Sequence, residues 1–535
     1  MPAISPIALA IQHFIQEITD IPVDHPIDHV LEDALVVEHE IRSLLACDPQ
    51  NVQLQDKFLG LFDVFSIAPA ARRHRAREID PGTTDLHKHY VFPLPQNKRK
   101  TTLTPSAVPN IEAFKRNWEI FTHRALFKMS TKDWQNVLAA GGSVLACIKR
   151  PNSNTSAQRL NEYYQSSVYE SSDIDLFLWG LTPEQAEVKM KDIYRAVCEA
   201  TAWKVTCVRK ANTVSLHTKF PYRPIQIVLR LYQSPAEILA GFDIDAACCA
   251  YDGHRVWANP RFLTALVRQS NTIDLTRRSP SYEMRLVKYA RRGFEIFLPT
   301  LRRDYIKQST MSKLYSRDLS TFPNGLARLL VLEVAYFRPN FYRQLRFPFA
   351  RRSLKKPVSN NNSRSGEDMV PSNDYDGNLW WAQIPYGPSW DADKIEALIA
   401  KKDAYLNSPY NPYNEDSENG SRHRHVFFAG TMAQCLGAFC NQCDNLVDDD
   451  GLMALEPRIY IRGPIKYVIA HRKVDETADK NRFITVNPGR QLATGSFQPV
   501  DEGEWTLEAY ESLDGSANDG EDLEQREGYI DGLDE

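Results

Sequence analysis

The hydrophobic and polar positions near the N-terminus follow the period of an α-helix. Apolar residues recur three and four positions apart within residues 7–18, 30–45 and 54–65, a spacing typical of amphipathic helices. We therefore expect residues 1–67 to form a helical N-terminal layer that carries no chemistry of its own.

Residues 68–109 break this period, because Arg, His, Lys and Pro are frequent there. The segment predicts an extended basic connector. Its most basic run, residues 72–77, is expected to be a solvated loop, since charge runs are usually solvated. Contact between this run and nucleic acid is the alternative.

Between residues 110 and 260 the pattern alternates between helix and strand. An amphipathic helix over 111–127 leads into a strand that begins at Trp134, and Thr182 caps a helix that reaches about residue 201. A short helix is also expected at 235–240. Short apolar runs bounded by turn residues predict further strands, at 204–209, 213–217, 225–231, 242–251 and 255–258. Strands with intervening helices predict an α+β domain over 110–260.

The C-terminal half is predicted in four parts. Residues 261–353 favour basic helices, and residues 354–424 favour a partly disordered linker with one amphipathic helix at 391–402. Residues 425–510 return to strand-like runs and predict a smaller β-rich module. Residues 511–535 predict an acidic disordered tail.

A glycine turn interrupts the first apolar run of the α+β domain. Residues 134–148 have the pattern of a strand, a tight turn and a helix start, with the break at Gly141, Gly142 and Ser143. The backbone N–H groups after such a turn have no helical partner, and glycine lets a phosphate approach them without a Cβ in the way. The turn is therefore a candidate phosphate-binding site. The 30 residues between Gly142 and Asp173 predict an insertion loop at the mouth of this site.

Two carboxylates open the next predicted strand. Asp173 and Asp175 start an apolar run that ends at Trp179. Because side chains on a strand alternate with a period of two, both carboxylates must lie on one face. Neighbouring carboxylates repel, and burying them unpaired is costly. A divalent cation resolves this conflict, and Mg²⁺ typically binds a few carboxylates together with substrate phosphates.

These two segments resemble the nucleotidyltransferase superfamily typified by DNA polymerase β. Its pattern is Gly-Ser after a strand, Asp-x-Asp on the next strand and a third acid on a later one. The resemblance extends from about Phe114 to about Asp252. The chain is also similar to a group of uncharacterised eukaryotic proteins, some with ankyrin repeats. The segments that recur in that group lie here at 140–146, 172–177, 241–245 and 281–294.

The superfamily resemblance implies an α+β fold with a nucleotidyltransferase-like mixed sheet flanked by helices. It implies in-line displacement on the α-phosphate of a nucleoside triphosphate, with two Mg²⁺ ions held by Asp173 and Asp175. Asp243 would complete one metal site and help to deprotonate the attacking hydroxyl. Asp245 is the second choice for the third acid. Alternatively Gln226 takes this position, supplies no charge, and indicates a binding module. The residues expected to contact the nucleotide are Gly141, Gly142, Ser143 and Ser172.

Charge is distributed unevenly along the chain, although the formal net charge is only −4. Residues 260–356 contain 21 Lys or Arg and 6 Asp or Glu, whereas residues 501–535 contain 14 acids and one Arg. Within 277–303, basic residues are interleaved with Tyr and Phe, which suits a phosphate backbone and base stacking. Nucleic acid is therefore a candidate partner of these helices. An ordinary solvated cationic face is the alternative.

The nine cysteines are scattered and form no disulfide-like framework. Cys435, Cys440 and Cys443, with His423 or His425, are candidate zinc ligands. Because only one Cys-x-x-Cys pair is present, buried structural cysteines are the preferred interpretation. We find neither the pattern of a signal peptide nor an apolar run near 18 residues. A cytoplasmic or nuclear protein with no membrane partner is expected.

The sequence as a whole favours an intracellular protein that transfers a nucleotide to an unknown acceptor with Mg²⁺. Two alternatives stay open. One is a catalytically inactive protein that binds nucleotide or RNA, and the other is a non-enzymatic interaction scaffold. The glycine turn and the acid pair support the first two, whereas the uneven charge distribution is compatible with all three.

Overall fold

The protein is represented by a computed structural model. It describes residues 6–22, 25, 27–75, 89–100, 104–149, 155–169, 172–210, 213–277, 282–303, 306, 325–337, 384–406, 428–436 and 483. Much of the predicted linker (354–424) and C-terminal module (425–510), and the whole predicted tail (511–535), lie outside the described residues.

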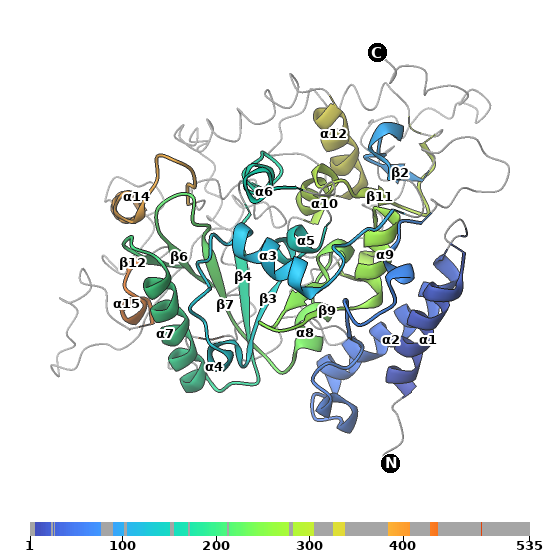
Figure 1. Cartoon of the computed structure of the whole chain (residues 1–535), viewed down its shortest axis with the longest axis horizontal. Helices are drawn as coiled ribbons and strands as arrows, with labels where there is room; N and C mark the ends of the chain where they lie inside the picture. The colour runs from blue at the N-terminus through green and yellow to red at the C-terminus, as the bar shows by residue number, and fades with distance from the viewer. Residues whose placement is uncertain are drawn as a thin grey trace, which may run out of the picture.

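A mixed nine-stranded sheet forms the centre of the molecule (Figure 1). Its strand order is β1-β9-β8-β3-β4-β7-β6-β5-β12, and every neighbouring pair is antiparallel except β4 and β7. The strands are β1 (Phe62–Asp63), β3 (Val137–Ala140), β4 (Ile174–Trp179), β5 (Thr206–Arg209), β6 (Thr213–His217), β7 (Ile225–Tyr232), β8 (Cys249–Tyr251), β9 (Val256–Ala258) and β12 (Phe428–Gly430).

Helices cover both faces of this sheet. On one face α3 (Ile111–Phe121), α5 (Gly142–Ile148) and α7 (Pro183–Ala200) bury their apolar sides against β3 and β4. On the other face α8 (Pro235–Ala240) packs against them. Alternation along β4 explains the two cores, because Ile174, Leu176 and Leu178 face one side and Phe177 the other. The prediction of a mixed sheet flanked by helices is thus confirmed.

A second, three-stranded sheet lies beside the first. It joins β2 (Tyr90–Val91), β10 (Ser270–Thr272) and β11 (Glu295–Phe297), in the order β10-β11-β2. Around it lie α9 (Pro260–Arg268), α10 (Tyr282–Arg291) and α12 (Gly325–Phe337). The expected connector at 68–109 and helical region at 261–353 therefore each contribute strands to one sheet, because the pairing that makes these strands is long-range.

The N-terminal layer contains two helices rather than three. These are α1 (Pro6–Asp20) and α2 (Asp28–Cys47), and α2 packs on α8 and α9. The helix expected over 54–65 is wrong, because Gly60 adopts a φ of 79° and Phe62 begins β1 against β9. The apolar residues of that run are nevertheless buried or half-buried. Their spacing therefore indicates burial in the core and not a helix.

The basic run at 72–77 is not a solvated loop in its described part. Arg72 and Arg75 are each 5 % exposed. Arg72 donates to the carbonyl oxygens of Val108 and Pro109, and Arg75 to those of Ile21 and Pro22. The two guanidinium groups satisfy backbone carbonyl oxygens just after α1 and just before α3. This explains why these two charged side chains are buried.

Four further features of the core differ from the sequence-based expectation. Trp134 ends the short helix α4 (Thr131–Trp134) rather than starting a strand, and α3 ends at Phe121. The insertion expected as a loop between Gly142 and Asp173 contains α5 and also α6 (Ala157–Tyr164). The strand expected over 242–251 is confined to β8, because residues 245–247 form a 3₁₀ turn.

The described part of the predicted C-terminal module belongs to the central sheet. β12 pairs with β5, and α15 (Met432–Leu436) packs on β5 and α7. Cys435 of α15 is buried and its thiol donates to the carbonyl oxygen of Cys207. The other candidate zinc ligands lie outside the described residues.

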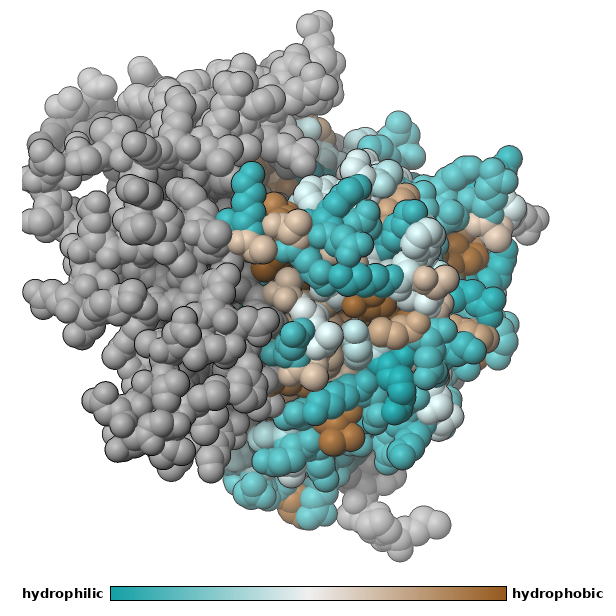
Figure 2. Space-filling model, turned by 90° about the vertical axis from the view of Figure 1, so that its left-hand side faces the viewer, coloured by the Kyte–Doolittle hydropathy of each residue, from teal (hydrophilic) through white to brown (hydrophobic). Residues whose placement is uncertain are grey.

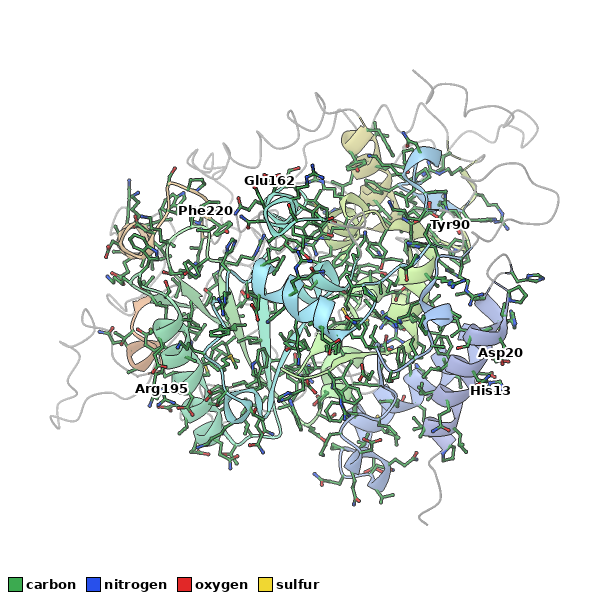
Figure 3. The ribbon with its side chains drawn as sticks, in the orientation of Figure 1. His13, Asp20, Tyr90, Glu162, Arg195 and Phe220 are labelled. Carbon is green, nitrogen blue, oxygen red and sulfur yellow. The ribbon has the colours of Figure 1, made fainter. Side chains whose placement is uncertain are left out.

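The α14 helix (Ala392–Leu406) lies at the same edge (Figure 1). Figure 3 places Phe220 on that side, where its ring lies 5.4 Å from that of Tyr386 in the segment before α14. On the side shown in Figure 2 the described surface is mostly hydrophilic, with small separate hydrophobic patches. None of the helices in the described ranges has the length and apolar character needed to cross a membrane.

Candidate functional site

The glycine turn forms as the sequence predicts. β3 ends at Ala140, Gly141 adopts a φ of 84°, and α5 begins at Gly142. Only glycine adopts such a φ without strain, which explains Gly141. The reason for Gly142 differs from the expectation. A Cβ at this position would overlap Nη1 of Arg292, so the space above the turn that we expected a phosphate to fill is filled by a guanidinium.

Ser143, the third residue of the turn, is 2 % exposed. Its hydroxyl has no hydrogen-bond partner among the described residues. A buried hydroxyl normally has one, because an unmade hydrogen bond costs free energy. The hydroxyl therefore stays available to an acceptor or donor that enters the site.

The two carboxylates lie beside this turn. In the register between β3 and β4, Asp175 is opposite Ala140, the residue before the turn. Asp173 lies just before β4, and its charge acts on Asp175. Burial and this neighbouring negative charge raise the pKa of Asp175 well above its ordinary value. The pair thus has the electrostatic conflict that the sequence predicts.

Gln226 occupies the position next to Asp175 on the neighbouring parallel strand. β4 and β7 pair so that Asp175 is opposite Gln226, and Nε2 of Gln226 donates to Oδ1 of Asp175 over 3.0 Å. This is the arrangement of the alternative in which glutamine replaces the third acid. An amide donor satisfies one lone pair of the carboxylate but adds no negative charge.

The acids expected to complete the site have other partners. Asp243 forms an ion pair with Arg285 of α10. Asp245 accepts from Nε of Arg261 and from the backbone N–H of Thr272, both over 2.8 Å. The two residues do not share the face of a strand, because Asp245 begins the 3₁₀ turn.

In the part of the chain that the structure describes, no three His, Cys, Asp or Glu side chains are grouped closely enough to hold a metal ion. The structure therefore brings Asp173 and Asp175 to the glycine turn and places Asp245 in a separate ion-pair cluster.

The sequence analysis missed the cations that face the carboxylates. Lys288 lies on α10, and Arg292 lies one turn later, just after the end of that helix. The charges of both residues act to lower the pKa of Asp175. Nη2 of Arg292 donates to the hydroxyl of Ser172 over 2.6 Å. Lys149 donates to the backbone carbonyl oxygen of Arg292, and burial followed by the charge of Arg292 lowers the pKa of Lys149 to about 8.

The sequence contained a pattern that could have identified these cations. Arg285, Lys288 and Arg292 have the spacing of one helical stripe, but we assigned the stripe to solvent or nucleic acid. Of the interleaved aromatic residues, Tyr282, Tyr289 and Phe294 are buried in the core. Their rings are therefore covered by protein and do not form an exposed stacking surface.

Arg223 also escaped the sequence analysis. Its guanidinium is 1 % exposed and donates to the carbonyl oxygens of Phe121, Tyr169 and Ser172 over 2.6–3.0 Å. It also donates to the carbonyl oxygen of Tyr164. These four bonds tie the end of α3 and the segment after α6 to the start of β7. They thereby fix the backbone that delivers Ser172 and Asp173 to the site.

Comparison with known proteins finds similarity to a protein family and to a viral protein. The model of the Gabija anti-defense 2 protein family matches residues 112–269, which run from α3 to just beyond α9. An uncharacterized protein of Acanthamoeba polyphaga mimivirus, R883, is 26 % identical over 460 residues, covering 78 % of this chain and 92 % of the viral protein. No solved structure matches the chain. The chain is therefore similar to an anti-defense family in its core and to a viral protein over most of its length.

Proposed function

We propose that this protein transfers a nucleotide from a nucleoside triphosphate to an acceptor with the help of Mg²⁺. One observation carries the proposal. The register of β3 and β4 places Asp175 opposite the residue that precedes the glycine turn, so that an acid pair and the turn share one end of two neighbouring strands. This is the juxtaposition that the superfamily resemblance leads us to expect.

The residues of the pair suit a magnesium ion. Asp173 and Asp175 offer carboxylate oxygens, which are hard ligands, and they repel each other until a cation lies between them. The two carboxylates would hold one ion, since Gln226 stands where a further acid would be needed for a second. When bound, the ion would supply Lewis-acid polarisation of a phosphoryl oxygen.

The remaining residues of the site act on charge and position. Lys288 and Arg292 would neutralise negative charge that develops on the phosphates in the transition state. Ser172 holds the Arg292 guanidinium through its hydroxyl, and Arg223 holds Ser172 through its carbonyl oxygen. Asp243, paired with Arg285, would support α10 from behind and keep its cations turned to the acids.

A second candidate function is nucleotide binding without transfer. The observation that favours it is Gln226, because a two-metal mechanism needs charge at this position and an amide carries none. The family match does not distinguish the two candidates, since residues 112–269 contain the turn, the acid pair and Gln226 together.

Incubation of the full chain with radiolabelled nucleoside triphosphates and Mg²⁺ tests the proposal. Label incorporated into protein, RNA or a small acceptor, and lost in Asp173→Asn and Asp175→Asn, is the expected result. A matched control is Asp192→Asn, which makes the same change at a half-buried acid of α7 that pairs with Arg195. Saturable nucleotide binding with no incorporation for any acceptor would leave the second candidate, and no binding would exclude both.

A further inference from the structure

The guanidinium of Arg292 is buried with donors unused. The residue is 3 % exposed, and its Nη2 is bonded to Ser172. Among the described residues, neither Nε nor Nη1 has a hydrogen-bond partner. An arginine carries five N–H donors and no acceptor, and leaving such donors buried and unpaired costs free energy. The site therefore lacks an acceptor next to Arg292.

Two aromatic rings hold this guanidinium in place. Its Cζ lies 5.1 Å from the ring centroid of Tyr169 and 5.1 Å from that of Tyr289. Contacts of this kind orient a planar cation as well as attract it. Together with the bond to Ser172, they fix Nη1 directly above Gly142. A phosphate could not contact the backbone of the turn unless the guanidinium moved.

Positive charge exceeds negative charge around this group. Lys149 donates to the backbone carbonyl oxygen of Arg292, and Lys288 and Arg292 both act on Asp175, which lies beside Asp173. Three cations thus stand against two acids. An anion would balance the charge and supply the missing acceptor oxygens at once.

We propose that Arg292, and not the backbone of the glycine turn, is the phosphate receptor of this site. The inference rests on the proposed function, since it names the group that binds the phosphate of the nucleotide. The phosphate enters from the side of Lys288, which is exposed, and of Asp173 and Asp175, which are half-buried.

Binding of two probes to the full chain tests the receptor. Isothermal titration calorimetry with ATP and with inorganic triphosphate, both with Mg²⁺, would compare the wild-type chain with Arg292→Gln, Arg292→Lys and the control Arg291→Gln. Arg291 is the adjacent exposed arginine, so the control removes the same charge. We expect Arg292→Gln to weaken both probes about 10- to 100-fold, Arg292→Lys to weaken them less, and Arg291→Gln to leave them within about twofold.

The direction of the change in affinity distinguishes an Arg292 that binds phosphate from one that merely blocks the turn. If Arg292 merely blocks the turn, Arg292→Gln would bind either probe more tightly, and the proposal would be overturned; unchanged affinity would overturn it as well. Gly142→Ala gives a second measurement with the charge retained, because its Cβ displaces Nη1. We expect weaker binding there too. Melting temperatures without ligand check that each variant is folded.

Failure of this proposal can be told apart from failure of the transferase proposal. Triphosphate binding that depends on Arg292, without any nucleotide transfer, supports the receptor and contradicts the transferase. Nucleotide transfer that depends on Asp175 but is unchanged in Arg292→Gln supports the transferase and contradicts the phosphate-binding role of Arg292. A wild-type chain that binds neither probe overturns both.

Discussion

Two groups of buried and half-buried acids in this molecule are neutralised to very different extents. In the first, which we call the α9 cluster (Glu38, Asp245, Arg261, Asp274 and Arg277), each acid meets an arginine. Arg261 joins Glu38 and Asp245 over 3.1 and 2.8 Å, and Arg277 joins Glu38 and Asp274 over 3.0 and 2.6 Å. This cluster connects α2 to α9 and to the segments on either side of β10.

The second group, the β4 pair of Asp173 and Asp175, forms no ion pair with any residue that the structure describes. Among the described side chains, the amide of Gln226 donates to Asp175, and the cations Lys288 and Arg292 act on this acid from farther away. A complete cluster stabilises a fold, whereas an incomplete one keeps a strained electrostatic state that a ligand can relieve. The comparison gives the α9 cluster a structural role and supports the proposed binding of a ligand by the β4 pair.

The largest effect is expected from breaking the α9 cluster. Arg261→Met removes the arginine that forms ion pairs with both Glu38 and Asp245. The two buried carboxylates then lack this positively charged partner. Loss of one partner of a buried ion pair costs about 3–5 kcal/mol of the free energy of unfolding. Urea denaturation measures it, with Lys191→Ala as control, because its exposed pair with Glu187 contributes no more than about 0.5 kcal/mol. A loss below about 1 kcal/mol for Arg261→Met would remove the structural assignment.

The next largest effect is expected in the pH dependence of stability. It tests whether the β4 pair or the surrounding core determines how far the stability falls at acidic pH. Burial, as the main cause, lowers the pKa of His74 and of His123 to about 4 each. Unfolded chains protonate these rings near pH 6.5 but the folded chain does not. The stability they contribute is therefore present above pH 6.5 and is lost as the pH falls toward 4, by roughly 2–3 kcal/mol for each residue.

His74→Gln and His123→Gln should each flatten this loss in chemical denaturation series between pH 7 and 4. The exposed His13 serves as the control, because its ring is reached by solvent. An unaltered slope in both variants would show that other groups set the acid limit.

A smaller effect is expected from restoring charge to the β4 pair. Gln226→Glu places a third carboxylate beside Asp175 with little change in volume. It should tighten Mg²⁺ binding about tenfold, because each added carboxylate strengthens a site for a hard cation. Calorimetric titration with Mg²⁺ measures the change, and Gln233→Glu, on the segment after β7, is a control of the same chemistry. Equal Mg²⁺ affinity for wild type and Gln226→Glu would show that no ion binds at this end of β4.

The smallest effect is expected from relieving the repulsion within the pair. Asp175→Asn keeps the acceptor for Gln226 and removes one negative charge, so the free energy of unfolding should rise by about 0.5–2 kcal/mol at pH 7 without Mg²⁺. Thermal denaturation measures it. The same substitution in the α9 cluster, Asp245→Asn, should destabilise the fold instead, because Arg261 loses its charged partner. If both substitutions shift stability in the same direction, the contrast between the groups is not real.

Local elements were predictable where neighbouring residues determine them. Thr182 caps α7 together with Gln185 as the capping signal indicates, and α8 has the predicted bounds. The glycine turn and the acid pair also form where expected, because a strand, a turn residue with positive φ and the period of a strand are local properties. The strands expected at 213–217 and 225–231 are confirmed as β6 and β7.

Long-range partners were not predictable. Asp243 and Asp245 were expected on one face of a strand, yet each is held by an arginine more than ten positions away along the chain. The strand-like runs expected from residue 425 onward gave no partner, and β12 pairs with β5 of the central sheet. Such choices depend on which groups meet after folding, and no periodicity within a segment records them.

The sequence by itself determined that a glycine turn and two acids would lie at strand ends in an α+β domain, because backbone conformation and side-chain alternation follow from neighbouring residues. Only the tertiary structure decided what surrounds them. It set Gln226 next to Asp175, brought the charges of Lys288 and Arg292 close to that acid, and placed the guanidinium of Arg292 against Gly142. The reason is physical: electrostatic interactions between side chains act through space, so that their outcome depends on the folded positions of residues that are distant in the chain.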